Sequence, residues 1–215
     1  MCILQVQNGP LTKVCYTKES ANFSRLAALV ISVGTLALKR QFNEIYSPGM
    51  LRHVLDYETV FNDLQILKEK NIISSKQWSK LYPHARRLVS ADTFDISLLM
   101  VLIRNICYCL PPPSSGWNKL PSSEDTTLSA DIARVSYFRN LLAHASKASI
   151  DSETFEDYWT ILSEALVRLL GESCRPDLDD LKESTLDPSI GDHYNSCLPR
   201  EIEGKGEEEN TQQTG

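Results

Sequence analysis

The chain has 215 residues, of which 42% are hydrophobic and 23% are charged, and its formal net charge is −6. This composition excludes a largely disordered protein and a fibrous one. The charge is uneven: from Gly171 onward four bases face twelve acids, giving −8, whereas residues 1–170 carry 18 bases and 16 acids, giving +2. The acidic balance therefore belongs to the tail and does not exclude a polyanionic partner for the remainder.

Hydropathy and cysteine usage predict a cytoplasmic protein that does not associate with membranes. The most apolar stretch, Leu26 to Leu38, has 13 residues, whereas a membrane span needs about 20. The N-terminus MCILQVQNGP lacks the basic lead and long apolar core of a secretory signal. The cysteines form no C-x-x-C pair, so we expect free thiols rather than a zinc site or a disulfide framework. The six positions are Cys2, Cys15, Cys107, Cys109, Cys174 and Cys197.

In the first half of the chain, apolar residues recur at helical spacing, with no persuasive strand alternation. After a loose segment over residues 1–19, a helix capped by Ser20 or Asn22 runs to about Tyr46. A break at Ser47-Pro48-Gly49 precedes a short helix, and another helix ends near Asn71. A helical turn then follows Ser74-Ser75 and closes at Pro83.

The second half begins with the most hydrophobic predicted helix. Residues 96–103 are apolar except for Ser97, which predicts a central helix, and Asp92 is expected to cap it. The run Pro111-Pro112-Pro113 predicts a rigid connector, with a ligand for a proline-binding partner as the alternative. Further helices start near Ser129 and near Asp151.

Gly171 ends the last predicted helix, and residues 172–215 read as a disordered acidic tail. The expected fold is therefore an all-α single helical bundle over residues 20–171.

One stretch is basic and contains aromatic residues. Lys76, Lys80, Arg86 and Arg87 surround Trp78 and Tyr82. Such a pattern is typical of a surface that contacts a phosphate backbone and stacks bases, which makes these four cations candidate RNA-binding residues. The alternative is a solvated basic face whose aromatic side chains point into the core.

The candidate catalytic residues lie at the end of the helix that starts near Ser129, in the run Arg139-Asn140-Leu141-Leu142-Ala143-His144. On a helical wheel with Ile132 at zero, Arg139 falls near 340°, inside the apolar stripe, and His144 falls near 120°, outside it. An arginine suits phosphate oxygens and a histidine can transfer a proton to or from a ribose hydroxyl. The alternative makes Arg139 a structural ion-pair partner, for example of Asp131, and His144 an ordinary helix C-terminal residue.

The divergence of Arg139 and His144 adds a constraint on catalysis. A working site needs a distorted helix end or two copies that meet about a twofold axis. No phosphate-binding loop, metal-ligand motif or other familiar catalytic signature occurs, so neither a cofactor nor a metal is predicted.

Longer runs of sequence carry a resemblance to a known family. The order F-D-I-S-L-L-M-V-L-I-R-N-I, P-P-P, G-W-N, P-S-S and S-A-D-I-A-R-V-S-Y-F-R-N resembles one branch of the HEPN superfamily. K-N-I-I-S-S-K-Q-W-S-K-L-Y-P and Y-W-T-I-L-S-E-A-L-V-R-L-L-G also resemble this branch, so the similarity spans about residues 20–171. The branch is the HEPN-like domain of the DAZ-interacting zinc-finger ubiquitin ligase and of invertebrate proteins of immune-receptor type.

The resemblance implies a helical bundle that pairs as a homodimer through the motif face. It also implies metal-independent cleavage of single-stranded RNA, with Arg139, Asn140 and His144 as the catalytic residues. Leu141 stands where relatives often carry a glutamate, and the ligase lacks a clear histidine at the motif. The alternative is therefore a non-catalytic module that binds protein or RNA in immune-signalling or ubiquitin-related assemblies. No RING pattern occurs in the chain, so the resemblance does not extend to ligase chemistry.

Overall fold

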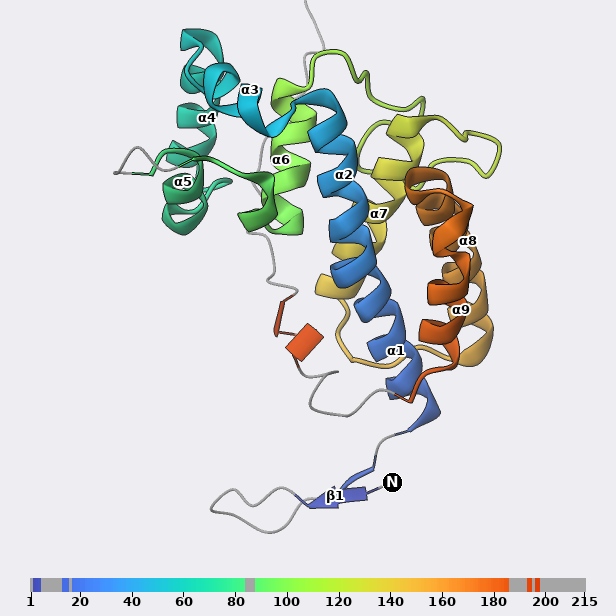
Figure 1. Cartoon of the computed structure of the whole chain (residues 1–215). Coiled ribbons are helices and arrows are strands. Elements are labelled where there is room, and N and C mark those ends of the chain that lie inside the picture. The colour runs from blue at the N-terminus through green and yellow to red at the C-terminus, as the bar shows by residue number, and fades with distance from the viewer. Residues whose placement is uncertain are drawn as a thin grey trace, which may run out of the picture.

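The computed structural model describes residues 2–4, 13–15, 17–83, 88–185, 193–194 and 196–197. These residues form an all-α bundle with one small strand pair, as Figure 1 shows. The elements are β1 (Cys2–Leu4), β2 (Lys13–Cys15), α1 (Lys18–Ala28), the π-helical turn η1 (Leu29–Gly34), α2 (Thr35–Ile45), α3 (Pro48–Leu55), α4 (Glu58–Glu69), α5 (Ser75–Leu81), the 3₁₀ turn η2 (Ala91–Thr93), α6 (Ile96–Ile106), α7 (Leu128–Ala143), α8 (Ser152–Leu170), the 3₁₀ turn η3 (Glu172–Cys174) and α9 (Arg175–Glu183).

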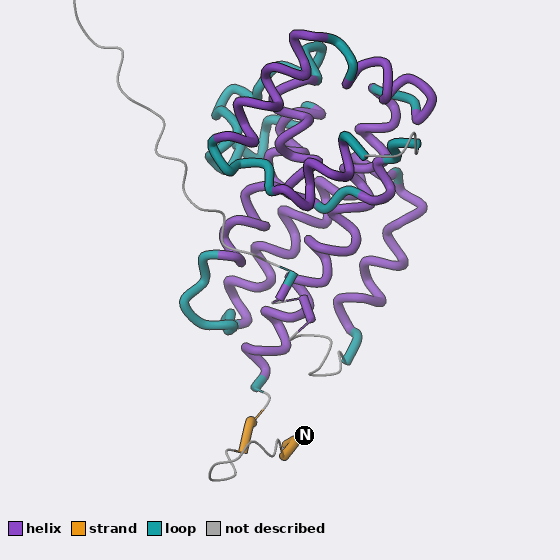
Figure 2. Tube along the Cα trace, turned by 90° about the vertical axis from the view of Figure 1, so that its left-hand side faces the viewer, coloured by secondary structure: helices purple, strands orange, loops and turns teal. Residues whose placement is uncertain are grey.

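The N-terminal segment is more structured than the sequence indicated. β1 and β2 pair antiparallel, with Ile3 opposite Val14, and Figure 2 shows this pair set apart from the helices. The first helix begins at Lys18 and is capped by Thr17, whose side chain accepts from the Ser20 N–H, so the predicted caps at Ser20 and Asn22 are wrong. Thr17 serves because its backbone is still extended while its oxygen reaches the first turn.

α1, η1 and α2 form one continuous helix from Lys18 to Ile45, and Tyr46 caps its end as predicted. In the described part of the chain, this is the helix long and apolar enough to cross a membrane by length and composition. Most of its apolar window is buried against the other helices, which is typical of a core helix. At Gly34 the helix comes so close to α7 that a β-carbon would lie 3.0 Å from a methyl group of Val135.

The helices α3, α4 and α5 form a lobe on the far side of α6 from α2 (Figure 1). Pro48 begins α3, as predicted, because its fixed φ suits the first helical turn. Asn71 ends the turn after α4 with a φ of 59°, and Ser74 and Gln77 form a reciprocal capping box that starts α5. These short helices therefore begin and end where local sequence favours it.

α6 is deeply buried, as predicted, but Asp95 caps it in place of Asp92. Asp92 lies inside η2 instead. The helix buried on every side is α7, since each residue from 129 to 136 is buried. α7 therefore occupies the central position that the sequence indicated for α6.

The predicted start of the tail at residue 172 is also wrong. Asp151 caps α8, and Gly171, with a φ of 96°, ends it. The chain then continues into η3 and α9, and Leu178 of α9 is buried in the common core. Lys182 pairs with Glu156 of α8 at 2.6 Å. Residues 172–183 thus belong to the folded domain, because α9 covers part of α8.

We expect Leu178→Ala to lower the free energy of unfolding by about 2 kcal/mol, because it leaves a cavity between α9 and the core. Asp179→Ala, at an exposed position of the same helix, is the matched control and should change stability by less than about 0.5 kcal/mol. Urea unfolding measures both. Equal stability of the two variants would show that α9 does not contribute to the packed core.

Two cysteines near the end of α6 should differ in reactivity. Burial raises the pKa of Cys107 to about 12, whereas Cys109 is exposed. The thiolate is the nucleophile, so at about pH 8 roughly one Cys107 side chain in ten thousand is reactive. Iodoacetamide should therefore alkylate Cys109 first, with Cys107 protected until the protein is unfolded in urea. Mass spectrometry of the peptide that contains both cysteines reads the order, and equal rates in the native state would contradict it.

Candidate functional site

The side chain of Arg139 lies inside the bundle and is 3% exposed. Its Nη2 donates to Oγ of Ser97 on α6 at 2.8 Å, and its Nη1 donates to Oδ1 of Asn140 at 3.0 Å. Ser97 is the polar residue that interrupts the apolar run of α6, and sequence analysis assigned it no role. Arg139 therefore joins α7 to α6 through a hydrogen bond that replaces water as its partner.

Asn140 and His144 complete the predicted catalytic set. Asn140 is half-buried and accepts the bond from Arg139, so the structure brings these two residues together. His144 caps the C-terminal end of α7, where its backbone N–H donates to the Asn140 carbonyl at 3.0 Å, and its side chain is exposed. Burial of Arg139 and exposure of His144 agree with the divergence expected from the helical wheel.

Asp131, suggested by the sequence as a partner of Arg139, pairs with two other arginines. Its Oδ1 accepts from Nη1 of Arg134 at 2.7 Å, and both carboxylate oxygens accept from Arg168 of α8, at 2.7 and 2.8 Å. Asp131 is 1% exposed and Arg134 is 2% exposed. The hydrogen bonds from Arg168 fit the bidentate geometry of a carboxylate, and those bonds raise the pKa of the Arg168 guanidinium.

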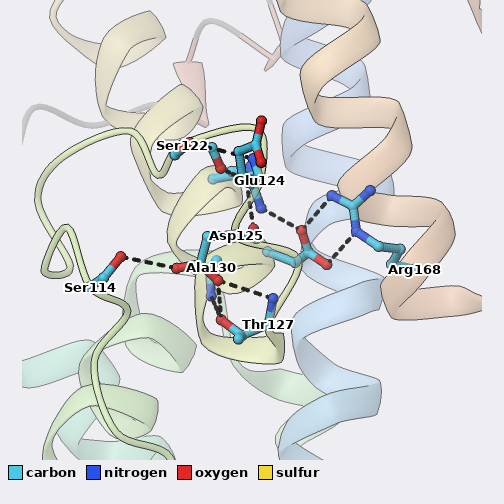
Figure 3. Close-up of polar contacts among 9 residues, drawn as sticks. Ser114, Ser122, Glu124, Asp125, Thr127, Ala130 and Arg168 are labelled. Carbon is cyan, nitrogen blue, oxygen red and sulfur yellow. Dashed lines mark hydrogen bonds and ion pairs between the residues drawn. The ribbon is translucent and has the colours of Figure 1, made fainter.

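The proline-rich loop between α6 and α7 supplies carbonyl groups to the polar side chains of α7. Arg134 donates to the carbonyls of Ser122 and Asp125, and Ser129 donates to the carbonyl of Pro111. Figure 3 shows the loop held against α7, with Arg168 reaching the same cluster from α8. The loop therefore acts as the connector that the prolines predicted, and it satisfies groups that would be costly to bury alone.

The same loop is closed by its own short-range contacts. Oδ1 of Asp125 accepts from both the hydroxyl and the backbone N–H of Thr127, and Ser114 donates to the other carboxylate oxygen (Figure 3). These bonds, those from Thr127 first, lower the pKa of Asp125. Thr127 in turn caps α7 by accepting from the Ala130 N–H. The loop thereby fixes where the central helix begins.

Of the four predicted RNA-binding residues, the structure describes Lys76 and Lys80, which lie one turn apart on α5. Lys76 is exposed on α5, and Lys80 pairs with Asp95 at 3.5 Å. Arg86 and Arg87 lie outside the described residues. The assignment of these four residues to RNA binding stays a prediction.

The aromatic residues of the basic stretch, Trp78 and Tyr82, are half-buried and pack against the edge of the core. The rings of Trp78 and Tyr82 lie 4.5 Å apart, and Phe61 contacts both edge to face. The ammonium of Lys68 lies 4.6 Å from the centroid of the Trp78 ring. Burial raises the pKa of Tyr82 to about 12, and its hydroxyl donates to the Leu55 carbonyl.

Sequence reasoning missed the pairing of Asp131 with Arg134 and Arg168. On the same helical wheel, Asp131 falls near 260°, inside the apolar stripe, so a signal for a buried acid was present. Arg134 follows three residues later, at a spacing that brings side chains together on a helix. Nothing local indicated Arg168, because it lies 37 residues further along the chain. Within the described residues, no group of three His, Cys, Asp or Glu side chains could hold a metal ion.

Asp131→Asn should lower the free energy of unfolding by about 3–5 kcal/mol, because it leaves the buried Arg134 without its counter-charge. Asp56→Asn removes the partner of Arg52 in an exposed ion pair and should cost less than about 1 kcal/mol. Urea unfolding of both variants tests the difference. Similar losses of free energy of unfolding in the two variants would mean that the buried ion pair stabilises the domain no more than an exposed one.

Comparison with known proteins agrees with the sequence resemblance. The chain is 29% identical over 174 residues to the E3 ubiquitin-protein ligase DZIP3 of Homo sapiens, and equally so to that of Mus musculus. Each alignment covers 80% of this chain and 14% of the ligase. No solved structure is significantly similar. Residues 48–194 match the family described as DZIP3/hRUL138-like HEPN, and since that match covers more than half of the sequence, the chain belongs to this family.

Proposed function

We propose that this chain is a non-catalytic interaction module built on a HEPN domain. The observation that carries the proposal is the burial of Arg139, whose guanidinium donates to Ser97 and Asn140 inside the bundle. A phosphate clamp must present its donors to a substrate in solution. Arg139 serves packing between α6 and α7 instead, so binding to a partner falls to the outer surface of the domain.

The ligase relatives suggest where such a module acts. The matched segment is a small part of a protein named as a ubiquitin ligase. A helical domain of this kind suits a role in bringing partners to ubiquitin-related or immune-signalling assemblies. The chemistry of the ligase does not follow from the shared segment, because the alignment covers 14% of that protein.

A second candidate function rests on the order of the motif. Arg139, Asn140 and an exposed His144 stand at the end of α7 in the order that the superfamily uses for metal-independent RNA cleavage. In that candidate, two copies pair through the motif face, Arg139 turns to the scissile phosphate of a single-stranded RNA, and His144 transfers the proton. It requires Arg139 to exchange its bond to Ser97 for one to the substrate.

The decisive experiment compares the wild-type protein with His144→Ala on single-stranded RNA in the presence of EDTA. The interaction-module proposal predicts no turnover by either protein. The endoribonuclease candidate predicts cleavage by the wild type and a loss of about 10²–10⁴ in rate in the variant. Cleavage that depends on His144 would overturn the first proposal. Equal cleavage by both proteins would sink the second and point to a contaminating nuclease.

Stability measurements separate the two residues independently of activity. Arg139→Ala should lower the free energy of unfolding by about 2 kcal/mol, because Ser97 and Asn140 lose a buried hydrogen-bond donor. His144→Ala, at an exposed position, should cost less than about 1 kcal/mol. Thermal and urea unfolding provide the values. A stable Arg139→Ala variant would contradict the structural role of the arginine.

A further inference from the structure

The segment from α3 to the turn after α4 exposes several large apolar side chains. Nine large hydrophobic side chains are exposed in the described part of the chain, and five of them lie within residues 50–72. The five are Met50, Tyr57, Phe61, Ile66 and Ile72. Single exposed apolar residues are normal on a soluble protein, so the relevant residue is Phe61, the member of this set that lines a groove.

A groove runs between α4 and α5 in this lobe. It encloses about 350 Å³ and is lined by Phe61, Gln65, Lys68, Glu69 and Trp78. The rings of Phe61 and Trp78 lie 5.8 Å apart at an interplanar angle of 64°, so they form two walls of the groove. Gln65 donates to Glu69 at 3.2 Å, which engages the carboxylate of the groove within its own helix. Two aromatic rings and three polar side chains therefore line this open groove.

Lys68 is the lysine that lines the groove, while Lys70 lies at the end of α4 and Lys76 at the start of α5. In the described part of the chain, no carboxylate lies within ion-pair distance of Lys68, Lys70 or Lys76, whereas Lys80 pairs with Asp95. The ammonium of Lys68 rests on the Trp78 ring, 4.6 Å from its centroid. A lysine on a flexible stem can leave that ring and pair with an arriving carboxylate, which opens the aromatic wall to an apolar side chain.

We propose that this groove binds an acidic segment of a partner protein. An apolar side chain of the segment enters between Phe61 and Trp78, and flanking carboxylates pair with Lys68 and Lys76. The inference rests on the proposed role as an interaction module and names the chemistry of its partner. Charge complementarity selects the acidic segment, and the apolar lining selects the anchor.

The same surface suits RNA less well. A stacked base needs a flat slot with parallel walls, but the Phe61 and Trp78 rings meet at 64° and form a wedge. Tyr82, 4.5 Å from the Trp78 ring, occupies a further part of the aromatic surface. An aliphatic side chain fits a wedge better than a planar base does. These contacts favour a peptide, and they make RNA the competing outcome of the test.

The test is a titration of the full chain, labelled with ¹⁵N, followed by NMR. The probe is a synthetic acidic peptide with a single leucine anchor, and its controls are the same peptide with serine for leucine or with glutamine for each acid. We expect the leucine peptide to shift the indole N–H signal of Trp78 and the amides of α4 and α5. Both control peptides should bind at least about fivefold more weakly, since each lacks one of the two contacts.

Variants locate the site on the protein. Lys68→Glu should weaken binding of the leucine peptide by about fivefold or more, while Lys147→Glu, an exposed lysine after α7, should change it by less than about twofold. Phe61→Ser offers a second variant, because Phe61 lines the groove and its side chain is exposed. It should also weaken binding, and unfolding curves show that each variant is folded.

Several outcomes would overturn the inference. They are an absence of shifts with the leucine peptide, shifts outside α4 and α5, or equal effects of Lys68→Glu and Lys147→Glu. Tighter binding of an oligouridylate than of the peptide would assign the surface to RNA. None of these depends on RNA cleavage, so failure of the groove is distinguishable from failure of the interaction-module proposal.

Discussion

The carboxylate of Asp131 is the point on which the packing of the domain depends. It binds Arg134 within α7 and Arg168 across the interface with α8, while Arg134 also holds the proline-rich loop by two carbonyls. One buried acid thus ties together the central helix, its neighbour and the long connection between α6 and α7. Burial of this charge is tolerated because Arg134 and Arg168 donate hydrogen bonds to both oxygens of the carboxylate.

The same requirement explains how α7 can be the central helix. Its sequence alternates apolar and polar residues, yet every residue from 129 to 136 is buried. Ser129 donates to a loop carbonyl, Ser136 accepts from Arg104 and Arg139 donates to Ser97. Polar groups on a buried helix are affordable only when neighbours satisfy them. The arginine of the motif is one member of this set.

The central helix and the outer lobe of the domain differ in which side chains they bury and which they expose. The central helix α7 commits most of its polar side chains to internal contacts. The lobe of α3, α4 and α5 instead leaves several large apolar side chains at the surface. The partner contact that we propose lies on this lobe. Of the twelve acids from Gly171 onward, five lie in residues 172–183, which belong to the domain.

The sequence by itself determined the helical class, the family and most element boundaries, because apolar periodicity and capping residues act within a few turns of chain. Pro48, Ser74, Asp151 and Gly171 each mark a boundary that holds in the structure. Periodicity also put Arg139 on the buried face of α7 and His144 outside it. Only the tertiary structure decided what Arg139 contacts, that Asp131 binds Arg168, and that α9 belongs to the domain. Those contacts join residues far apart in sequence, and their partners are set by how whole helices pack rather than by any local pattern.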